Sequence, residues 1–248
     1  MKTTILQQLL NDRKAKRAVV ALTNLDDGDT HLVHPDDESE VGELSPDIRD
    51  AVRLAASSDR SNTIESPVGR IFVNIFNPPL RIIIVGAVHI AQPLARMSVE
   101  AGYEVTVVDP RRAFATEDRF PGVDLLPDWP DDALAELAPD IRTAIVTLTH
   151  DPKIDDPALS MALRSPAFYI GSLGSKKTHR ARLMRLTNEG FDDAQLARIS
   201  GPVGLAIGAR SPAEIAVAIL AQITQHLRQP EAPQAQLDPA VEVVGTAA

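Results

Sequence analysis

The stretch that most constrains the fold runs from Arg81 to Ala91 and reads R-I-I-I-V-G-A-V-H-I-A. No polar residue alternates with the apolar run 82–85, which is typical of a strand buried on both faces of a parallel sheet. Gly86 ends this run, and from His89 to Ala101 apolar residues recur at helical spacing. The pattern predicts a strand, a glycine turn and a helix.

A second apolar run, 103–108, ends in Asp109, which follows Gly86 at close to the spacing of about 20 residues that is usual in a dinucleotide-binding βαβ unit. Val88 stands where that unit normally has the glycine that lets the backbone approach a pyrophosphate. Two interpretations therefore stay open: the unit binds NAD(P), or it is a Rossmann scaffold that has lost its dinucleotide. The predicted cofactor-binding residues of this unit are Gly86, Ala87, Val88, His89, Asp109 and Arg111.

The choice between NAD and NADP stays open in the sequence. An acid such as Asp109 at the end of the second strand favours a ribose diol, whereas the nearby Arg111 could accept a 2′-phosphate.

Composition narrows the classes of partner. The formal net charge of −9 argues against a nucleic-acid-binding surface. The chain has no cysteine, which excludes disulfides, thiolate metal sites and a cysteine nucleophile within it. No apolar run approaches a membrane span, and no signal peptide is evident. The sequence predicts a cytoplasmic protein with neither a membrane nor a nucleic acid as partner.

The predicted fold class is α/β, with a Rossmann-like doubly wound parallel sheet and a small N-terminal domain. We expect the small α+β domain over residues 1–78, the Rossmann-like domain over 79–229 and a disordered tail rich in Pro, Ala and Gln over 230–248. An acidic segment, 26–50, contains His31 and His34. It is interpreted as a polar turn between two short strands and not as a metal site.

His150 follows a predicted buried strand, 143–148, at the edge where open α/β sheets bind ligands. His150 and His89 are the candidate catalytic acids or bases, and a loop or capping role is the alternative for His150. Asp155 and Asp156 are predicted to cap a helix over 158–163.

Two further glycine-rich segments follow. A strand over 167–170 runs into G-S-L-G-S-K and a basic helix, which predicts an anion cradle, with a tight turn bearing solvated Lys and Arg as the alternative. The segment 201–210 precedes a capping box at Ser211 and Glu214 that opens a helix to about Leu227. The predicted binding residues in these later segments are His150, Gly171, Ser172, Gly174, Ser175, Lys176, Arg180, Gly204 and Gly208.

Five motifs in this order resemble the XdhC/CoxI family of maturation factors over about residues 80–227. They are G-A-V-H-I-A, D-P-R with R-F-P, T-H-D, Y-I-G-S-L-G-S-K and G-P-V-G-L-A-I-G-A-R-S-P-A-E-I-A. The resemblance implies a chaperone that binds the molybdenum cofactor and delivers it to a molybdenum hydroxylase of the xanthine dehydrogenase or carbon monoxide dehydrogenase type. It also implies help from a cysteine desulfurase, which supplies the cofactor's terminal sulfur.

The chain departs from the family pattern at Val88 and in the segment 42–48, which begins like the family's N-terminal motif but lacks its two glycines and its cysteine. It therefore resembles a short, divergent member. The leading hypothesis is a homo-oligomeric cofactor-binding maturation factor and not an enzyme with turnover. The alternatives are an NAD(P)-dependent oxidoreductase using His150 or His89 and a regulatory partner that binds no small molecule.

Overall fold

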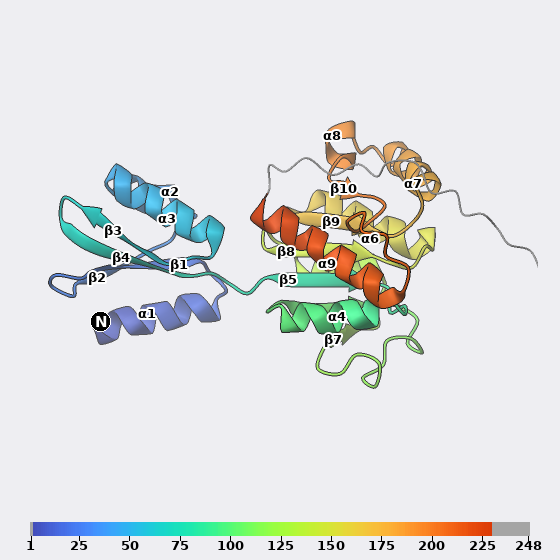
Figure 1. Cartoon of the computed structure of the whole chain (residues 1–248), viewed down its shortest axis with the longest axis horizontal. Coiled ribbons are helices and arrows are strands. Elements are labelled where there is room, and N and C mark those ends of the chain that lie inside the picture. The colour runs from blue at the N-terminus through green and yellow to red at the C-terminus, as the bar shows by residue number, and fades with distance from the viewer. Residues whose placement is uncertain (1, 230–248) are drawn as a thin grey trace, which may run out of the picture. The chain divides into compact units, whose positions relative to one another are not determined.

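The computed structural model describes residues 2–229, and the chain divides into two compact units, Met1–Pro79 and Leu80–Ala248 (Figure 1). The fold is mixed α/β, as the sequence predicts, with one antiparallel sheet and one parallel sheet. The tail for which we predict disorder, 230–248, lies outside the described residues.

The first unit is a four-stranded antiparallel sheet with helices on both sides (Figure 1). Val52 and Ala55 on one helix pack against Val20 and Val73 of the sheet, and all four side chains are fully buried. In strand order β2-β1-β4-β3, the strands are β1 (Val19–Asn24), β2 (Thr30–Val33), β3 (Asn62–Ser66) and β4 (Gly69–Phe76). The helices are α1 (Thr3–Lys14), α2 (Glu38–Gly42) and α3 (Pro46–Ser58).

The second unit is the predicted doubly wound sheet, with six parallel strands in the order β10-β9-β8-β5-β6-β7. Its strands are β5 (Arg81–Val85), β6 (Glu104–Val108), β7 (Asp124–Leu126), β8 (Thr143–Thr147), β9 (Tyr169–Ser172) and β10 (Ile199–Ser200). Its helices are α4 (Ala91–Glu100), α5 (Pro130–Leu137), α6 (Pro152–Arg164), α7 (Lys176–Asn188), α8 (Asp193–Leu196) and α9 (Pro212–Arg228).

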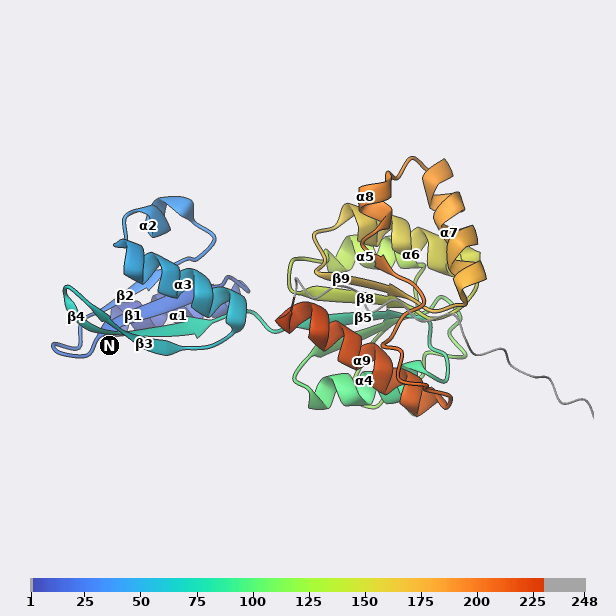
Figure 2. The same cartoon turned by 45° about the horizontal axis from the view of Figure 1, so that its top comes forward.

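Helices cover both faces of this sheet (Figure 2). On β5, Ile82 and Ile84 pack into the cluster formed with α4 and α9, whereas Ile83 and Val85 pack into the opposite cluster formed with α5 and α6. Because successive side chains of a strand point to opposite faces, a strand covered on both sides needs an unbroken apolar run. The apolar run 82–85 therefore indicates that β5 lies in the interior of the sheet, between β8 and β6.

Two predicted helix starts were wrong. The helix after β5 begins at Ala91 and not at His89, so residues 86–90 form a loop. Helix α6 begins at Pro152, with Asp151 as its cap through a hydrogen bond from the Lys153 amide, and it continues through the later proline. The predicted start at residue 158 lies just after that later proline, whereas the proline at the first helical position is Pro152.

The predicted start of α9 is confirmed. The Ser211 side chain accepts a hydrogen bond from the Glu214 amide, the Glu214 carboxylate accepts one from the Ser211 amide, and Pro212 lies at the first helical position.

Candidate functional site

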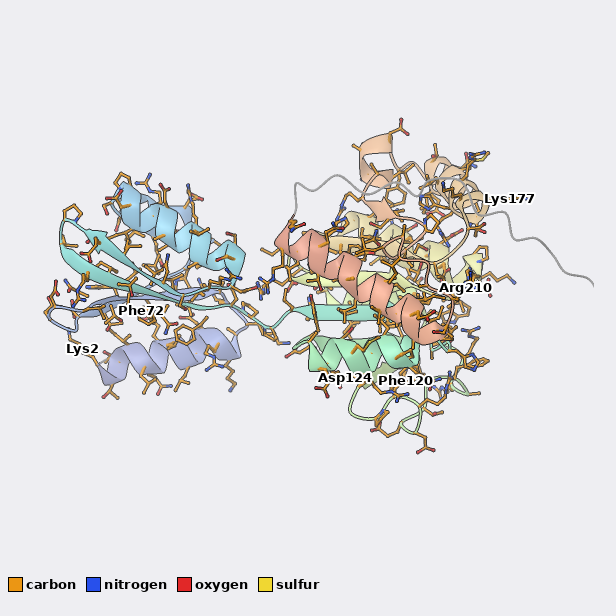
Figure 3. All side chains as sticks on the ribbon, in the orientation of Figure 1. Lys2, Phe72, Phe120, Asp124, Lys177 and Arg210 are labelled. Carbon is orange, nitrogen blue, oxygen red and sulfur yellow. The ribbon has the colours of Figure 1, made fainter. Side chains whose placement is uncertain are left out.

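The candidate site lies at the carboxyl edge of the parallel sheet, where loops follow β5, β6, β8, β9 and β10. The strand order reverses beside β5, since the chain runs from β5 to β6 on one side and later returns to β8 on the other. Ligands of open α/β sheets bind at such a switch point. Lys177 of α7 and Arg210 of the loop before α9 mark this end of the second unit in Figure 3.

Gly86 brings the two loops at the switch point into contact. Its φ of +111° is in the region that favours glycine, and a Cβ built there would lie 2.5 Å from Cγ2 of Thr149 in the loop after β8. A side chain at this position would therefore push the loops after β5 and β8 apart. Val88, two residues later, packs its partly buried side chain against the cluster shared with α4 and α9.

Asp109, at the end of β6, is fully buried and is bound by groups of its own chain. Its Oδ1 accepts hydrogen bonds from the backbone amide and Nε of Arg111, both at 2.9 Å, and its Oδ2 accepts from Nη2 of Arg111 and from the Ala87 amide, both at 2.8 Å. Burial raises the pKa of the Asp109 carboxyl, but the hydrogen bonds from Arg111 and Ala87 outweigh it and leave the pKa below its ordinary value.

The guanidinium of Arg111 is fixed as well. It stacks over the ring of Phe114 at 4.7 Å, and hydrogen bonding to Asp109 raises its pKa, as do the carboxylates of Asp151 and Asp155 across the switch point. Asp109 and Arg111, both predicted as cofactor-binding residues, thus bind each other.

The two candidate catalytic histidines, His89 and His150, are exposed at this edge. His150 has a left-handed backbone, with φ at +62°, and its amide donates to Oδ2 of Asp155 at 3.1 Å. Within residues 2–229 no side chain makes a hydrogen bond or ion pair with either imidazole, so neither histidine belongs to an oriented acid–base pair in this part of the chain.

The predicted anion cradle lies between β9 and α7. Strand β9 ends at Ser172, two residues later than predicted, so Gly171 and Ser172 are buried strand residues and the turn begins at Leu173. In the turn, Gly174 has a φ of +150°, and Ser175 caps α7 by accepting from the Thr178 amide at 3.1 Å.

The first turns of α7 carry positive charge at the positive end of the helix dipole. Lys176, Lys177 and Arg180 are all exposed, and the first turn contains no acidic residue. Cations are normally disfavoured at a helix N-terminus, and a bound anion reverses that preference because it interacts favourably with both the side chains and the free amides. Gly204 and Gly208 lie in the loop after β10 at the same edge of the sheet.

The predicted capping role of Asp155 and Asp156 was wrong. Both lie inside α6 and are buried, and each pairs with an arginine of α7. Oδ2 of Asp155 lies 3.6 Å from Nη2 of Arg182, and Asp156 binds Arg185 with Oδ1 3.0 Å from Nη2. Burial raises the pKa of Asp155, although hydrogen bonds from Thr149 oppose this.

Sequence reasoning missed Arg182, since an arginine in a basic helix is ordinarily solvated. The signal that could have found it is the spacing of four residues between Arg182 and Leu186. This spacing places both residues on one side of α7, which is the buried side.

The histidines of the acidic segment have local partners in the first unit. His31 pairs with Asp29 at 2.9 Å, and His34 lies between Asp12 and Glu40, 3.2 Å and 3.0 Å away. Over residues 2–229, no group of three or more His, Asp or Glu side chains is arranged to hold a metal ion. In the same range, no helix has both the length and the apolar character needed to span a membrane.

Comparison with known proteins decides the family. The model of the XdhC Rossmann domain matches residues 82–223, more than half of the chain. The chain belongs to the XdhC family. This range contains the anion cradle, the switch point and the Asp155–Arg182 pair.

Two curated relatives match about three fifths of this XdhC chain. It is 34% identical over 155 residues to a probable xanthine dehydrogenase subunit of Bacillus subtilis, covering 62% of this chain and 45% of that one. It is 30% identical over 148 residues to the molybdenum cofactor insertion chaperone PaoD of Escherichia coli, covering 60% and 40%. The match thus spans less than half the length of each relative.

A solved structure resembles nearly the whole chain. The crystal structure of a protein described as a xanthine dehydrogenase from Bacillus halodurans aligns with a TM-score of 0.69 and 26% identity, covering 92% of this chain and 68% of that one. The likeness therefore reaches into the first unit, beyond the matched Rossmann domain.

Proposed function

We propose that this XdhC chain binds the molybdenum cofactor and assists its insertion into a molybdenum hydroxylase of the xanthine dehydrogenase type. The single observation that carries the proposal is the β9–α7 turn, because the exposed Lys176, Lys177 and Arg180 lie in the first two turns of a helix whose first turn contains no acidic residue. The names of the two curated relatives support the same assignment.

The chemistry of the cradle fits the cofactor. Molybdopterin ends in a phosphate, and free amides at a helix start together with flexible cations are suited to that group. We assign the phosphate to the turn at Gly174 and Ser175 and to the side chains of Lys176 and Arg180. The remaining predicted residues at this edge, His89, His150, Gly204 and Gly208, are proposed to line the rest of the ligand site.

The alternative function, an NAD(P)-dependent oxidoreductase, is less favoured by the geometry. Asp109, the residue expected to bind the ribose diol, has its acceptor positions filled by Arg111 and Ala87. A molybdenum hydroxylase client and a cysteine desulfurase remain predictions of the family resemblance, and a homo-oligomeric state and a cytoplasmic location remain predictions from the sequence.

The test is cofactor retention after expression in cells that make the molybdenum cofactor. Molybdenum content and the fluorescence of the oxidised pterin are measured on the purified protein. The double variant Lys176→Glu/Arg180→Glu should lose at least about tenfold of both signals, because two cations near a phosphate become anions.

The matched control is Arg13→Glu/Lys14→Glu, which makes the same charge change on exposed residues of α1 in the first unit. The control should retain cofactor like the unmodified protein. Equal retention by the cradle variant and the control would place the site elsewhere, and no molybdenum or pterin in the unmodified protein would refute the proposed function.

A further inference from the structure

Arg182 and Asp155 form a buried pair that connects two loops of the candidate site. The side chain of Arg182 is 2% exposed and that of Asp155 is 1% exposed. Asp155 lies on α6 just after the loop that follows β8, and Arg182 lies near the middle of α7, the helix that follows the turn after β9. Side chains of a helix point toward its N-terminus, which directs the Arg182 side chain back toward that turn.

On the β8 side, the carboxylate of Asp155 fixes the loop by three hydrogen bonds. Oδ1 accepts from the hydroxyl of Thr149 at 2.7 Å and from its amide at 3.2 Å, and Oδ2 accepts from the His150 amide at 3.1 Å. These bonds hold His150 in its left-handed conformation at the switch point.

On the β9 side, the guanidinium fixes the turn. Nη2 of Arg182 donates to the Leu173 carbonyl at 3.0 Å, and Nη1 lies 3.8 Å from the place where a Cβ on Gly174 would stand. The same Nη2 faces Asp155 at 3.6 Å, so one nitrogen contacts both sides.

Stability alone does not explain the pair. Among the described residues, Nε and Nη1 of Arg182 are buried without a hydrogen-bond partner, and burying an unsatisfied donor destabilises the fold. A buried ion pair is often matched or bettered by apolar residues of similar volume. The contacts that an apolar residue could not replace are those to Leu173 and to the carboxylate that holds Thr149 and His150.

We propose that Arg182 is a positioning residue, which acts through Asp155 and the Leu173 carbonyl to set the β8 loop and the anion cradle at a fixed separation for one ligand. The inference rests on the proposed function for the identity of that ligand. The coupling between the two loops is a property of this chain, and it can be measured in the absence of the ligand.

The chain offers a matched control on the same two helices. Arg185 of α7 binds Asp156 of α6, the neighbour of Asp155, and no hydrogen bond of Arg185 reaches either loop in the described residues. Arg182→Met and Arg185→Met therefore each remove one arginine between α6 and α7, and only the first also removes the contacts to the site.

The first measurement is amide hydrogen exchange resolved by NMR. Arg182→Met should lower the protection of the Thr149 and His150 amides by about tenfold or more and shift the carbonyl ¹³C resonance of Leu173, the acceptor of the Arg182 bond, whereas Arg185→Met should leave both amides within about twofold and that resonance in place. Arg182→Lys, which keeps the charge in place if the methionine variant does not fold, should preserve protection at Thr149 and His150 but still shift the Leu173 carbonyl resonance, because an ammonium cannot span both partners.

The second measurement is molybdenum and pterin retention by the same variants. Loss in Arg182→Met, partial rescue in Arg182→Lys and normal retention in Arg185→Met are expected. Unchanged protection of Thr149 and His150 in Arg182→Met, or equal loss in Arg185→Met, would overturn the positioning role. Absence of cofactor from the unmodified protein would refute the proposed function, and the exchange data alone would then decide the role of Arg182.

Discussion

The carboxylate of Asp109 and the guanidinium of Arg111 form two parallel hydrogen bonds, from Nε to Oδ1 at 2.9 Å and from Nη2 to Oδ2 at 2.8 Å. With the amides of Ala87 and Arg111, the four acceptor positions of a buried carboxylate are all used. The acid that normally hydrogen-bonds the ribose in this fold is here bound by groups of its own chain.

Replacing this carboxylate should weaken the fold at neutral pH. Asp109→Asn is expected to lower the free energy of unfolding by about 1–3 kcal/mol at pH 7, since it removes charge-assisted bonds from a partly exposed arginine. The control Asp118→Asn, an exposed acid on the same loop, should change it by less than about 0.5 kcal/mol.

The difference between Asp109→Asn and the unmodified protein should depend on pH in one direction. The pKa of Asp109 is lowered in the folded state, so its stabilisation is complete well above the ordinary value of 3.8 and is lost as the pH falls through the folded pKa. Denaturant unfolding between pH 7 and pH 2.5 measures this. If the difference in unfolding free energy between the two proteins increased toward acid pH, the stabilising role of the ionised Asp109 would be contradicted.

Val88→Gly should tighten binding of NAD⁺. Although the Val88 side chain packs against the core, we predict that a β-branched residue at this position still keeps a pyrophosphate away from the loop amides and that glycine removes this obstacle. Calorimetry should show weak binding to the unmodified protein, intermediate affinity for Val88→Ala and the highest for Val88→Gly. Submicromolar binding by the unmodified protein, or no gain in the glycine variant, would refute the steric argument.

His34→Ala should destabilise the first unit. The side chain is 9% exposed and lies between Asp12 of α1 and Glu40 of α2, so its removal leaves Oδ2 of the buried Asp12 without its ion-pair partner, while Oδ1 keeps Arg17 at 3.6 Å. We expect a loss of about 1–3 kcal/mol in denaturant unfolding. His31→Ala, which removes a 75% exposed imidazole, serves as the control and should cost less than about 0.5 kcal/mol; equal losses would contradict the prediction.

Activation of a client hydroxylase should need a second sulfur-carrying protein. Transfer of a terminal sulfur requires a persulfide donor, normally a thiolate of low pKa, and this chain contains no cysteine. In a purified system without inorganic sulfide, the protein should support sulfuration only when a desulfurase or a cysteine-bearing companion is added. Activation without that companion would rule out this division of labour.

Local sequence determined the centre of the second unit. The run 82–85 can be satisfied only by burial on both faces, Gly86 supplies a backbone that other residues rarely adopt, and Ser211 and Glu214 cap α9 from within a four-residue window. Each of these signals acts between residues that are close in the chain, so periodicity and spacing were enough to predict β5, its turn and the start of α9.

Only the tertiary structure decided how the carboxyl-edge residues are paired. Strands as short as β10 (Ile199–Ser200) form because a neighbouring strand supplies hydrogen bonds, and such a strand has no periodicity of its own. Asp155 resembles a helix cap in the sequence, but its partner Arg182 is 27 residues away on another helix. A polar side chain becomes an inward-facing partner only when packing removes it from water, and the local sequence does not specify which distant group meets it there.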